Sequence, residues 1–458
     1  MAADSLHILI ANNYTIRGGI PKAVAALANA MTDRGHRVTI LNQRPVPRLL
    51  FPLYRLWRAL RDMSYPPAPV PAPLQGTRPI SRDYPLREGI RVLHFQFTDR
   101  NLKVQQLRER IRQLDSDVCV CPMADGAHLV WAVTLLGSGV PYVYSERHSP
   151  QTIENEFWNR KGRLAAMSGA DAIHLLLPSY LDSLPDFLRG RARAIPNAVK
   201  LPGRAADPAG APGARKTLLW LGRLHEPLKQ CRMAVDAFAL IAQKFPDWDL
   251  HIVGDGPDGP LIRAHAKQVA GRHNLEGRIQ FLGESGDVPA HFTSAQAYCF
   301  SSRTEGMPNA LLEGMAAGLP CVAFAGCPGV ADIITHGKNG LLAQAMDASS
   351  LAGQLERLLA DAPLRERLGA AARESMARFS ETAVFDAWEG MLREAAAQKG
   401  ATVMDAFSRE PFASMARLSS RARQEWALRD FGQPLCDSLA GRLREAWYIF
   451  RWRLQQWL

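Results

Sequence analysis

The chain has 458 residues, of which 47% are apolar and 22% charged, and its net charge is +11 at pH 7. This length and composition are those of a globular protein with two or more domains, and the positive charge favours an anionic partner. The first residues lack the basic start of a signal peptide and no apolar run approaches ~18 residues, so we expect a cytoplasmic protein with no spanning helix. Seven scattered cysteines, two of them in the C-x-C of Cys119 and Cys121, predict reduced thiols rather than a zinc or redox site.

Strands and helices alternate through the first part of the chain. Residues 6–13 predict a strand, the stretch opened by Gly18 and Gly19 predicts a helix that ends near Gly35, and residues 37–42 predict a second strand. Further strands are predicted at 91–97, 117–122, 140–146 and 172–179. We therefore predict a Rossmann-like domain over residues 1–200, with an amphipathic and proline-rich insertion at about 46–85.

A Gly/Pro/Ala-rich stretch at residues 201–215 has the composition of a linker. Beyond it the alternation begins again, with strands predicted at 216–223, 248–256, 279–284, 297–302 and 320–325. We predict an α/β fold in which a second Rossmann-like domain, residues 216–385, faces the first across a cleft. A basic and aromatic helical extension follows at residues 386–458.

Two glutamates of the second domain, Glu305 and Glu313, flank the start of a predicted helix. Glu305 follows the strand at 297–302, at the carboxyl edge where open parallel sheets bind ligands. Glu313 lies in the helix itself, whose amino end carries free N–H groups and partial positive charge. The pattern suggests an anion at the helix start, flanked by two carboxylates that accept hydrogen bonds from hydroxyl groups. A nucleotide sugar has this form, with a diphosphate between a ribose and a hexose. The alternative is that Glu305 is a solvated loop residue and Glu313 a residue on the helix surface.

These residues resemble glycosyltransferase family 4, whose members are retaining, nucleotide-sugar-dependent enzymes with the GT-B double-Rossmann fold. The resemblance covers roughly residues 6–395 and rests on EGMPNALLEGMAAGLP, RGGIPKAVAALANAMTDRGHRVTIL, IPNAV, LGRLHEPLKQ, HIVGDGP and GVADIITHGKNGLL. The stretch YSERHSP is similar to members that add N-acetylhexosamine or related sugars to polyprenyl-diphosphate-linked oligosaccharides.

The resemblance implies a role for each matching residue. Glu313 would accept hydrogen bonds from the ribose and Glu305 from the transferred sugar, while Arg223 and Lys229 would neutralise the diphosphate and support its departure. The family usually has Lys-Gly where this chain has Lys229-Gln230. Backbone or phosphate contacts are implied for Gly18, Gly19, Gly254, Gly283, Gly306, Asn309, Ala310 and Leu311.

The amino-terminal domain would carry the acceptor and one side of the reaction centre. Glu146, Arg147 and His148 compete to contact the donor sugar, and we rank His148 first among them, in a catalytic set with Glu305, Arg223 and Lys229. Retention without an evident nucleophile fits a same-face mechanism in which the leaving phosphate deprotonates the acceptor hydroxyl. The D-x-D of Asp247 and Asp249 precedes a strand and is predicted to be a surface turn, so we expect no cofactor and no obligatory metal.

We expect transfer of a hexosyl or N-acetylhexosaminyl unit, from a UDP-sugar rather than a GDP-sugar, to a lipid-linked or polysaccharide-precursor acceptor in cell-surface glycan biosynthesis. A sugar-nucleotide epimerase of the same fold and a non-catalytic GT-B scaffold are the alternatives. Nucleic acid is not an expected partner, because the arginines form no nucleic-acid motif. The oligomeric state stays open.

Two basic, aromatic stretches predict contact with an anionic membrane. They are residues 48–61 and 441–458, with membrane-facing candidates Arg48, Arg55, Trp57, Arg58, Arg61, Trp447, Arg451, Trp452 and Arg453. Arginine with tryptophan suits a lipid interface, and neither stretch is long enough to span. The alternative is a pair of amphipathic helices that pack on the domains. We expect peripheral binding at the inner face of the cytoplasmic membrane.

Overall fold

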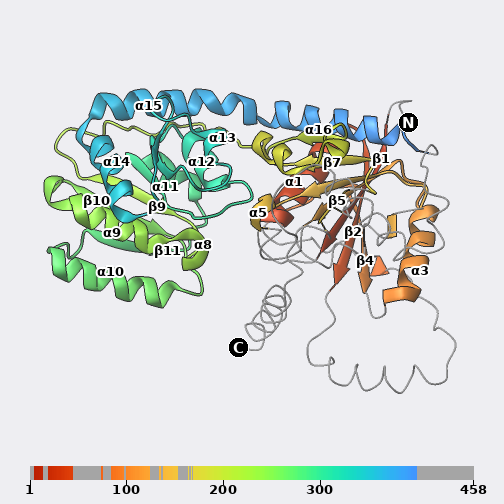
Figure 1. Cartoon of the computed structure of the whole chain (residues 1–458), viewed down its shortest axis with the longest axis horizontal. Helices are drawn as coiled ribbons and strands as arrows, with labels where there is room; N and C mark the ends of the chain where they lie inside the picture. The colour runs from red at the N-terminus through yellow and green to blue at the C-terminus, as the bar shows by residue number, and fades with distance from the viewer. Residues whose placement is uncertain are drawn as a thin grey trace, which may run out of the picture.

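The structure is a computed structural model, and it shows two α/β units side by side (Figure 1). It describes residues 5–13, 19–44, 74–75, 84–96, 100–123, 138–152 and 169–399, together with residues 131, 134, 135, 163, 164 and 167. The predicted extension beyond residue 399 and nearly all of the predicted insertion lie outside these residues, as do Gly18 and every membrane-facing candidate.

The amino-terminal unit is built on an eight-stranded sheet with the order β3-β4-β2-β1-β5-β6-β7-β8. Neighbouring strands are parallel except for β3 and β4. The strands are β1 (His7–Asn13), β2 (Arg37–Arg44), β3 (Leu74–Gln75), β4 (Arg91–Gln96), β5 (Val118–Met123), β6 (Tyr142–Glu146), β7 (Ala172–Leu175) and β8 (Ala192–Ala194). The helices are α1 (Gly19–Asp33), α3 (Arg100–Gln113), α5 (Pro150–Thr152), η4 (Pro178–Ser183) and α7 (Asp186–Arg189).

The apolar pattern explains why these segments pack as they do. Ile8, Leu9 and Ile10 of β1 are all fully buried, because a central parallel strand is covered by helices on both faces. Helix α1 instead buries one stripe at helical spacing, formed by Val24, Leu27, Ala28 and Met31. The sheet and this stripe together form the core that holds the start of α1 at the carboxyl end of β1.

The carboxyl-terminal unit has a six-stranded parallel sheet with the order β11-β10-β9-β12-β13-β14. Its strands are β9 (Lys216–Leu221), β10 (Trp248–Val253), β11 (Ile279–Gly283), β12 (Ala297–Phe300), β13 (Cys321–Phe324) and β14 (Leu341–Ala343). Its helices are α8 (Glu226–Lys229), α9 (Cys231–Ile241), η5 (Ala242–Lys244), α10 (Gly259–His273), α11 (Val288–Ser294), α12 (Asn309–Ala316), α13 (Val330–Ile333), α14 (Ala348–Ala360) and α15 (Ala362–Ser375). Because all six strands are parallel, their carboxyl ends lie at the same edge of the sheet.

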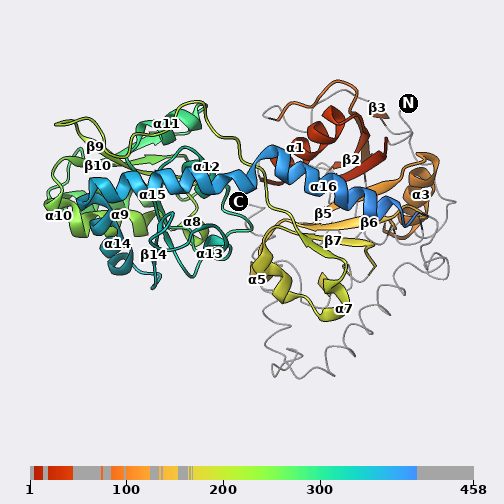
Figure 2. The same ribbon diagram turned by 90° about the horizontal axis from the view of Figure 1, so that it is seen from above.

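A helical rod connects the units a second time. It consists of α15, η6 (Met376–Phe379) and α16 (Glu381–Ala396), and Figure 2 shows it running from the carboxyl-terminal unit over the amino-terminal one. Helix α16 packs on α1, β5 and β6, and buries Trp388 and Leu392 against them. The amide of Val199, in the first connection, donates to the carbonyl of Phe379 at 2.9 Å, which ties the two connections together. The last described helix therefore completes the core of the first unit.

The expected α/β architecture of two Rossmann-like units is confirmed, and each strand predicted from an apolar run is present. Strands β3, β8 and β14 were not predicted; each is only two or three residues long, too short for a periodic pattern. Asn309 is the first residue of α12, and Pro308 precedes it as the cap. Within the described residues, no helix is both long and apolar enough to cross a membrane.

Candidate functional site

The candidate site lies where three neighbouring strands of the carboxyl-terminal sheet end. Strand β9 lies between β10 and β12, so the segments that follow them meet at one edge. Arg223 follows β9, Gly254 follows β10 and Glu305 lies beyond β12. A hydrogen bond of 2.9 Å from Trp220 Nε1 to Ser301 Oγ joins β9 to the segment after β12. The predicted residues of this domain therefore share one edge of the sheet.

Glu305 forms an ion pair with Lys229. The Lys229 Nζ donates to Glu305 Oε1 at 2.5 Å, and the side chains are 28% and 12% exposed respectively. Lys229 ends α8, and Gln230 after it adopts the left-handed conformation, with φ 48° and ψ 48°. Arg223 is exposed, and its guanidinium contacts no partner among the described residues. The edge thus presents one compensated and one uncompensated cation.

Glu313 is paired with a lysine of the other domain. Lys22 Nζ, in the first turn of α1, donates to Glu313 Oε1 at 2.8 Å. A Cβ atom on Gly19 would lie 3.9 Å from Nδ2 of Asn309, so the amino ends of α1 and α12 face each other. Sequence reasoning missed Lys22, because its local pattern is that of any solvated helix residue.

The loop that carries Glu305 packs against the end of β6. A Cβ atom on Gly306 would lie 2.4 Å from the carbonyl oxygen of Arg147 and 2.9 Å from Cα of His148, so glycine is required for this approach. The Tyr180 hydroxyl donates to the carbonyl of Gly306 at 2.9 Å. Burial raises the pKa of Tyr180, which keeps that donor protonated. This packing places His148 beside the Glu305 loop.

A chain of polar side chains links the two domains beneath this loop. Arg147 Nη1 donates to Asn197 Oδ1 at 3.2 Å, and Asn197 Nδ2 donates to Asn309 Oδ1 at 2.9 Å. Arg147 also lies over the ring of Trp388, at 5.6 Å from its centroid. Burial lowers the pKa of Arg147 to about 10, and its Nε has no hydrogen-bond partner among the described residues. Arg147, which follows β6, therefore holds the start of α12 through Asn197, which lies in the hinge between the two domains.

Glu146, a predicted candidate for contact with the donor sugar, is instead enclosed in the interior of the amino-terminal unit. Its carboxylate is fully buried and accepts two hydrogen bonds from Arg163, at 2.7 and 2.9 Å. Burying a carboxylate requires such a partner, so Glu146 is a core residue. The guanidinium of Arg147 is likewise directed into the interior, toward Asn197. His148 is half-buried, and its backbone, like that of Arg147, lies next to Gly306.

The amides predicted to meet phosphate or sugar are only partly available. The amide of Asn309 donates to the carbonyl of Met307 at 2.8 Å, and that of Leu311 donates to Pro308 at 3.0 Å. The side chain of Leu311 is fully buried as well. Of the three predicted positions, Ala310 is therefore the remaining candidate for a backbone contact.

The glycine-containing strand ends beside β9 are packed backbone to backbone. The amide of Gly254 donates to the carbonyl of Gly283 at 2.7 Å. A Cβ atom on Gly254 would lie 2.0 Å from the carbonyl oxygen of Gly222, and its φ is 129°. No side chain fits at Gly254, so a ligand beside that residue would meet main-chain atoms.

The D-x-D stretch lies at the opposite, amino edge of the sheet, where Trp248 pairs in register with Lys216. Lys216 Nζ donates to Asp247 Oδ2 at 2.6 Å, and Arg215 Nε donates to Asp249 Oδ2 at 2.7 Å. Asp249 is buried at the start of β10 and does not lie on a surface turn as predicted. The ion pair with Arg215 compensates for the loss of hydration of its carboxylate. Both carboxylates are remote from the Glu305 edge.

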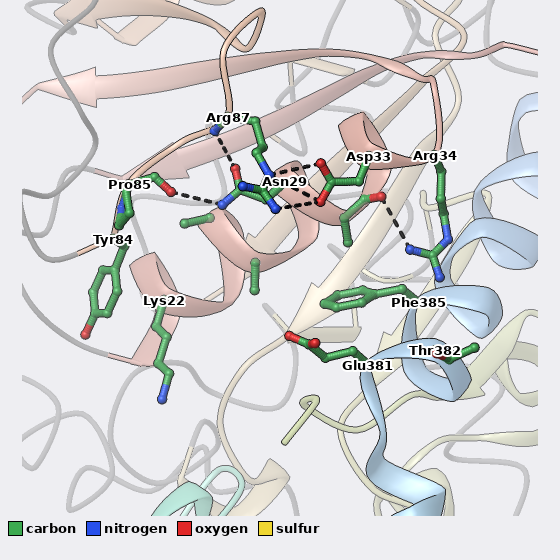
Figure 3. Close-up of a pocket in the computed structure, with 13 residues that line it drawn as sticks. Lys22, Asn29, Asp33, Arg34, Tyr84, Pro85, Arg87, Glu381, Thr382 and Phe385 are labelled. Carbon is green, nitrogen blue, oxygen red and sulfur yellow. Dashed lines mark hydrogen bonds and ion pairs between the residues drawn. The ribbon is translucent and has the colours of Figure 1, made fainter. Parts of the chain in front are cut away.

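A pocket of about 450 Å³ opens between α1, residues 84–87 and the start of α16 (Figure 3). Arg87 and Asp33 form a two-pronged ion pair within it, at 2.9 and 3.1 Å. Lys22 stands at its margin (Figure 3) and reaches Glu313. This pocket contains none of the site residues predicted from the sequence.

Comparison with known proteins identifies the second domain. Residues 215–361 match the family described as Glycosyl transferases group 1. These residues form a glycosyltransferase domain of group 1 type. An uncharacterized glycosyltransferase of Haemophilus influenzae is 26% identical over 63% of this chain and 79% of its own length. The phosphatidyl-myo-inositol mannosyltransferase of Mycobacterium leprae is 35% identical over 42% of this chain, and the match spans half of that relative.

The fold of the chain is also found in solved structures. Anabaena HepE in complex with UDP superposes with a TM-score of 0.62 and covers 85% of this chain and 100% of its own, at 18% identity. At this identity the likeness shows the fold alone. It agrees with the GT-B arrangement predicted from the sequence, in which two Rossmann-like units face each other.

Proposed function

We propose that this glycosyltransferase is a retaining enzyme that transfers a hexosyl or N-acetylhexosaminyl unit from a UDP-sugar to a lipid-linked or polysaccharide-precursor acceptor. The observation that carries the proposal is the meeting of Glu305, Lys229 and Glu313 with the start of α1 and with His148. The UDP in HepE supports the choice of donor, and the name of the mycobacterial relative supports a lipid-linked acceptor.

In this proposal each charged group of the site contacts one part of the donor. Glu313 accepts hydrogen bonds from the ribose, and Arg223 and Lys229 balance the diphosphate. Glu305 and His148 contact the transferred sugar. The acceptor hydroxyl attacks the anomeric carbon on the face from which the diphosphate leaves; the bond to the phosphate oxygen breaks, and that oxygen takes the hydroxyl proton. The step uses no metal, so turnover should persist in a chelator.

The first experiment incubates the protein with a panel of nucleotide sugars, with and without candidate lipid-linked acceptors, and measures release of nucleoside diphosphate. Acceptor-dependent release of UDP is expected. Interconversion of a free UDP-sugar without an acceptor would indicate an epimerase, and binding without turnover would indicate a scaffold. Either of these outcomes would overturn the proposal.

The second experiment tests the ribose contact. Loss of a charge-assisted partner costs ~1.5–3 kcal/mol, so Glu313→Ala should weaken UDP binding at least about tenfold while the protein stays folded. Glu356→Ala is the matched control, since Glu356 pairs with Lys244 at 2.7 Å and is 40% exposed. Unchanged UDP affinity in folded Glu313→Ala would remove Glu313 from the donor site.

We also propose peripheral binding to an anionic cytoplasmic membrane surface, which would bring the enzyme to a lipid-linked acceptor. The support is the sequence of residues 48–61 and 441–458, which lie outside the described residues. Sedimentation with anionic vesicles, weakened by salt, and not with neutral vesicles is expected. Equal recovery with anionic and neutral vesicles would contradict this proposal. Unchanged sedimentation after Trp57 and the four arginines of residues 48–61 are replaced by uncharged polar residues would contradict it as well.

A further inference from the structure

The two glutamates of the site differ in the origin of their counter-ions. Glu305 takes Lys229 from its own domain, whereas Glu313 takes Lys22 from the amino-terminal domain. Lys22 belongs to no motif of the donor domain and lies 291 positions from Glu313 in the chain. A residue predicted to bind the donor is thus held from across the domain interface.

The contact belongs to an ordered pair of facing helix turns. Gly19 lies opposite Asn309, and one turn further along each helix Lys22 meets Glu313. Asn309 is fixed in turn by Asn197 of the hinge, at 2.9 Å. The ammonium of Lys22 therefore reaches Glu313 in the arrangement in which α1 and α12 face each other.

The exposure of the pair argues for a role in ligand binding rather than in folding. The side chains of Lys22 and Glu313 are 56% and 31% exposed, and ion pairs so open to solvent contribute little to stability. Lys22 occupies Oε1 of Glu313, while a carboxylate offers about four lone-pair sites. The second oxygen remains for a hydroxyl group, in an orientation that the ammonium fixes.

We propose that Lys22 is a positioning residue for donor binding. From the amino-terminal domain it orients Glu313 toward the ribose of the nucleotide, so that full donor affinity depends on the two domains facing each other. The acceptor domain thereby takes part in recognition of the donor. This inference rests on the proposed function, specifically on the assignment of Glu313 to the ribose.

The test measures UDP affinity by calorimetry in the full-length protein. Lys22→Met is expected to weaken binding roughly fivefold, and Lys22→Arg to restore it to within about twofold. In a Glu313→Gln background, Lys22→Met should have no further effect, because the partner through which it acts is already lost. In turnover, Lys22→Met should raise the donor KM and leave kcat near the parent value.

Lys244→Met is the matched control. Lys244 pairs with Glu356 at 2.7 Å and is 61% exposed, and it should leave UDP affinity unchanged. Equal or tighter UDP binding by Lys22→Met, or additive losses in the double variant, would overturn the inference while leaving the proposed function standing. A parent protein that binds neither UDP nor GDP would overturn the proposed function itself.

Discussion

At the scale of single residues, Arg223 and Lys229 lie beside the same strand edge in different surroundings. Arg223 is exposed, whereas Lys229 is tied to Glu305 at 2.5 Å. Both cations would face a leaving diphosphate, whose charge grows in the transition state. The Arg223→Ala, Lys229→Ala double variant should therefore lose roughly a hundredfold or more in kcat, with a smaller rise in the donor KM. Steady-state release of nucleoside diphosphate measures both.

The contribution of Lys229 includes its effect on Glu305. Without Lys229 the Glu305 carboxylate, whose side chain is 12% exposed, keeps no counter-ion among the described contacts. The hydroxyl groups of the donor sugar would then meet a less ordered carboxylate. Lys244→Ala controls for loss of an exposed lysine. Parent-like turnover in the double variant would show that neither cation acts on the leaving group.

At the scale of elements, the turn between α8 and α9 carries a conformational cost. Gln230 joins them with φ 48° and ψ 48°, and its Oε1 is buried with no partner among the described residues. A non-glycine residue in this conformation costs about 1 kcal/mol, and the family usually has glycine here. Gln230→Gly should raise the free energy of unfolding by roughly 0.5–1 kcal/mol in urea titration.

Gln243→Gly provides the contrasting variant for that titration. Gln243 lies in η5, outside the left-handed region, and Nε2 donates to the carbonyl of His273. Glycine there should destabilise the protein, because it adds chain entropy and removes a bond. A Gln230→Gly protein no more stable than the parent would show that the left-handed turn is not strained.

Prediction from sequence succeeded where an element carries its own pattern. Central strands such as β1 and β9 are apolar runs bounded by turn residues, and Glu305 follows such a run, so the sheet edge could be inferred. The contacts of Lys22, Asn197 and Tyr180 could not, because each depends on a partner far away in the chain. For the same reason the sequence pattern favours Glu146 as a site residue, although the fold pairs it with the buried Arg163.

At the scale of the whole molecule, the chain crosses between its domains twice and ends, among the described residues, on the first one. Helix α16 follows α15 and η6 of the carboxyl-terminal unit, yet it packs into the core of the amino-terminal unit (Figures 1 and 2). Arg34, the residue after α1, donates from Nη2 to Oδ1 of Asp386 in α16 at 2.9 Å. The predicted boundary at residue 385 therefore falls inside α16, a helix that packs on the amino-terminal unit.

Trp388 is the side chain through which α16 acts on both the fold and the site. It is 2% exposed, its ring centroid lies 4.3 Å from that of His174, and Arg147 lies over it at 5.6 Å. Trp388→Ala should lower the free energy of unfolding by about 3–5 kcal/mol, because it removes a large buried ring and leaves a cavity. It should also weaken UDP binding, since Arg147 would lose the surface that directs it toward Asn197 and Asn309.

Urea unfolding followed by circular dichroism measures the first effect, and calorimetry with UDP the second. Leu240→Ala is the control, because Leu240 is 53% exposed and its truncation should change stability by less than about 0.5 kcal/mol. Trp388→Phe should recover most of the stability, as an aromatic ring still fills the site. A Trp388→Ala protein within about 1 kcal/mol of the parent would mean that α16 rests on the amino-terminal domain without completing its core.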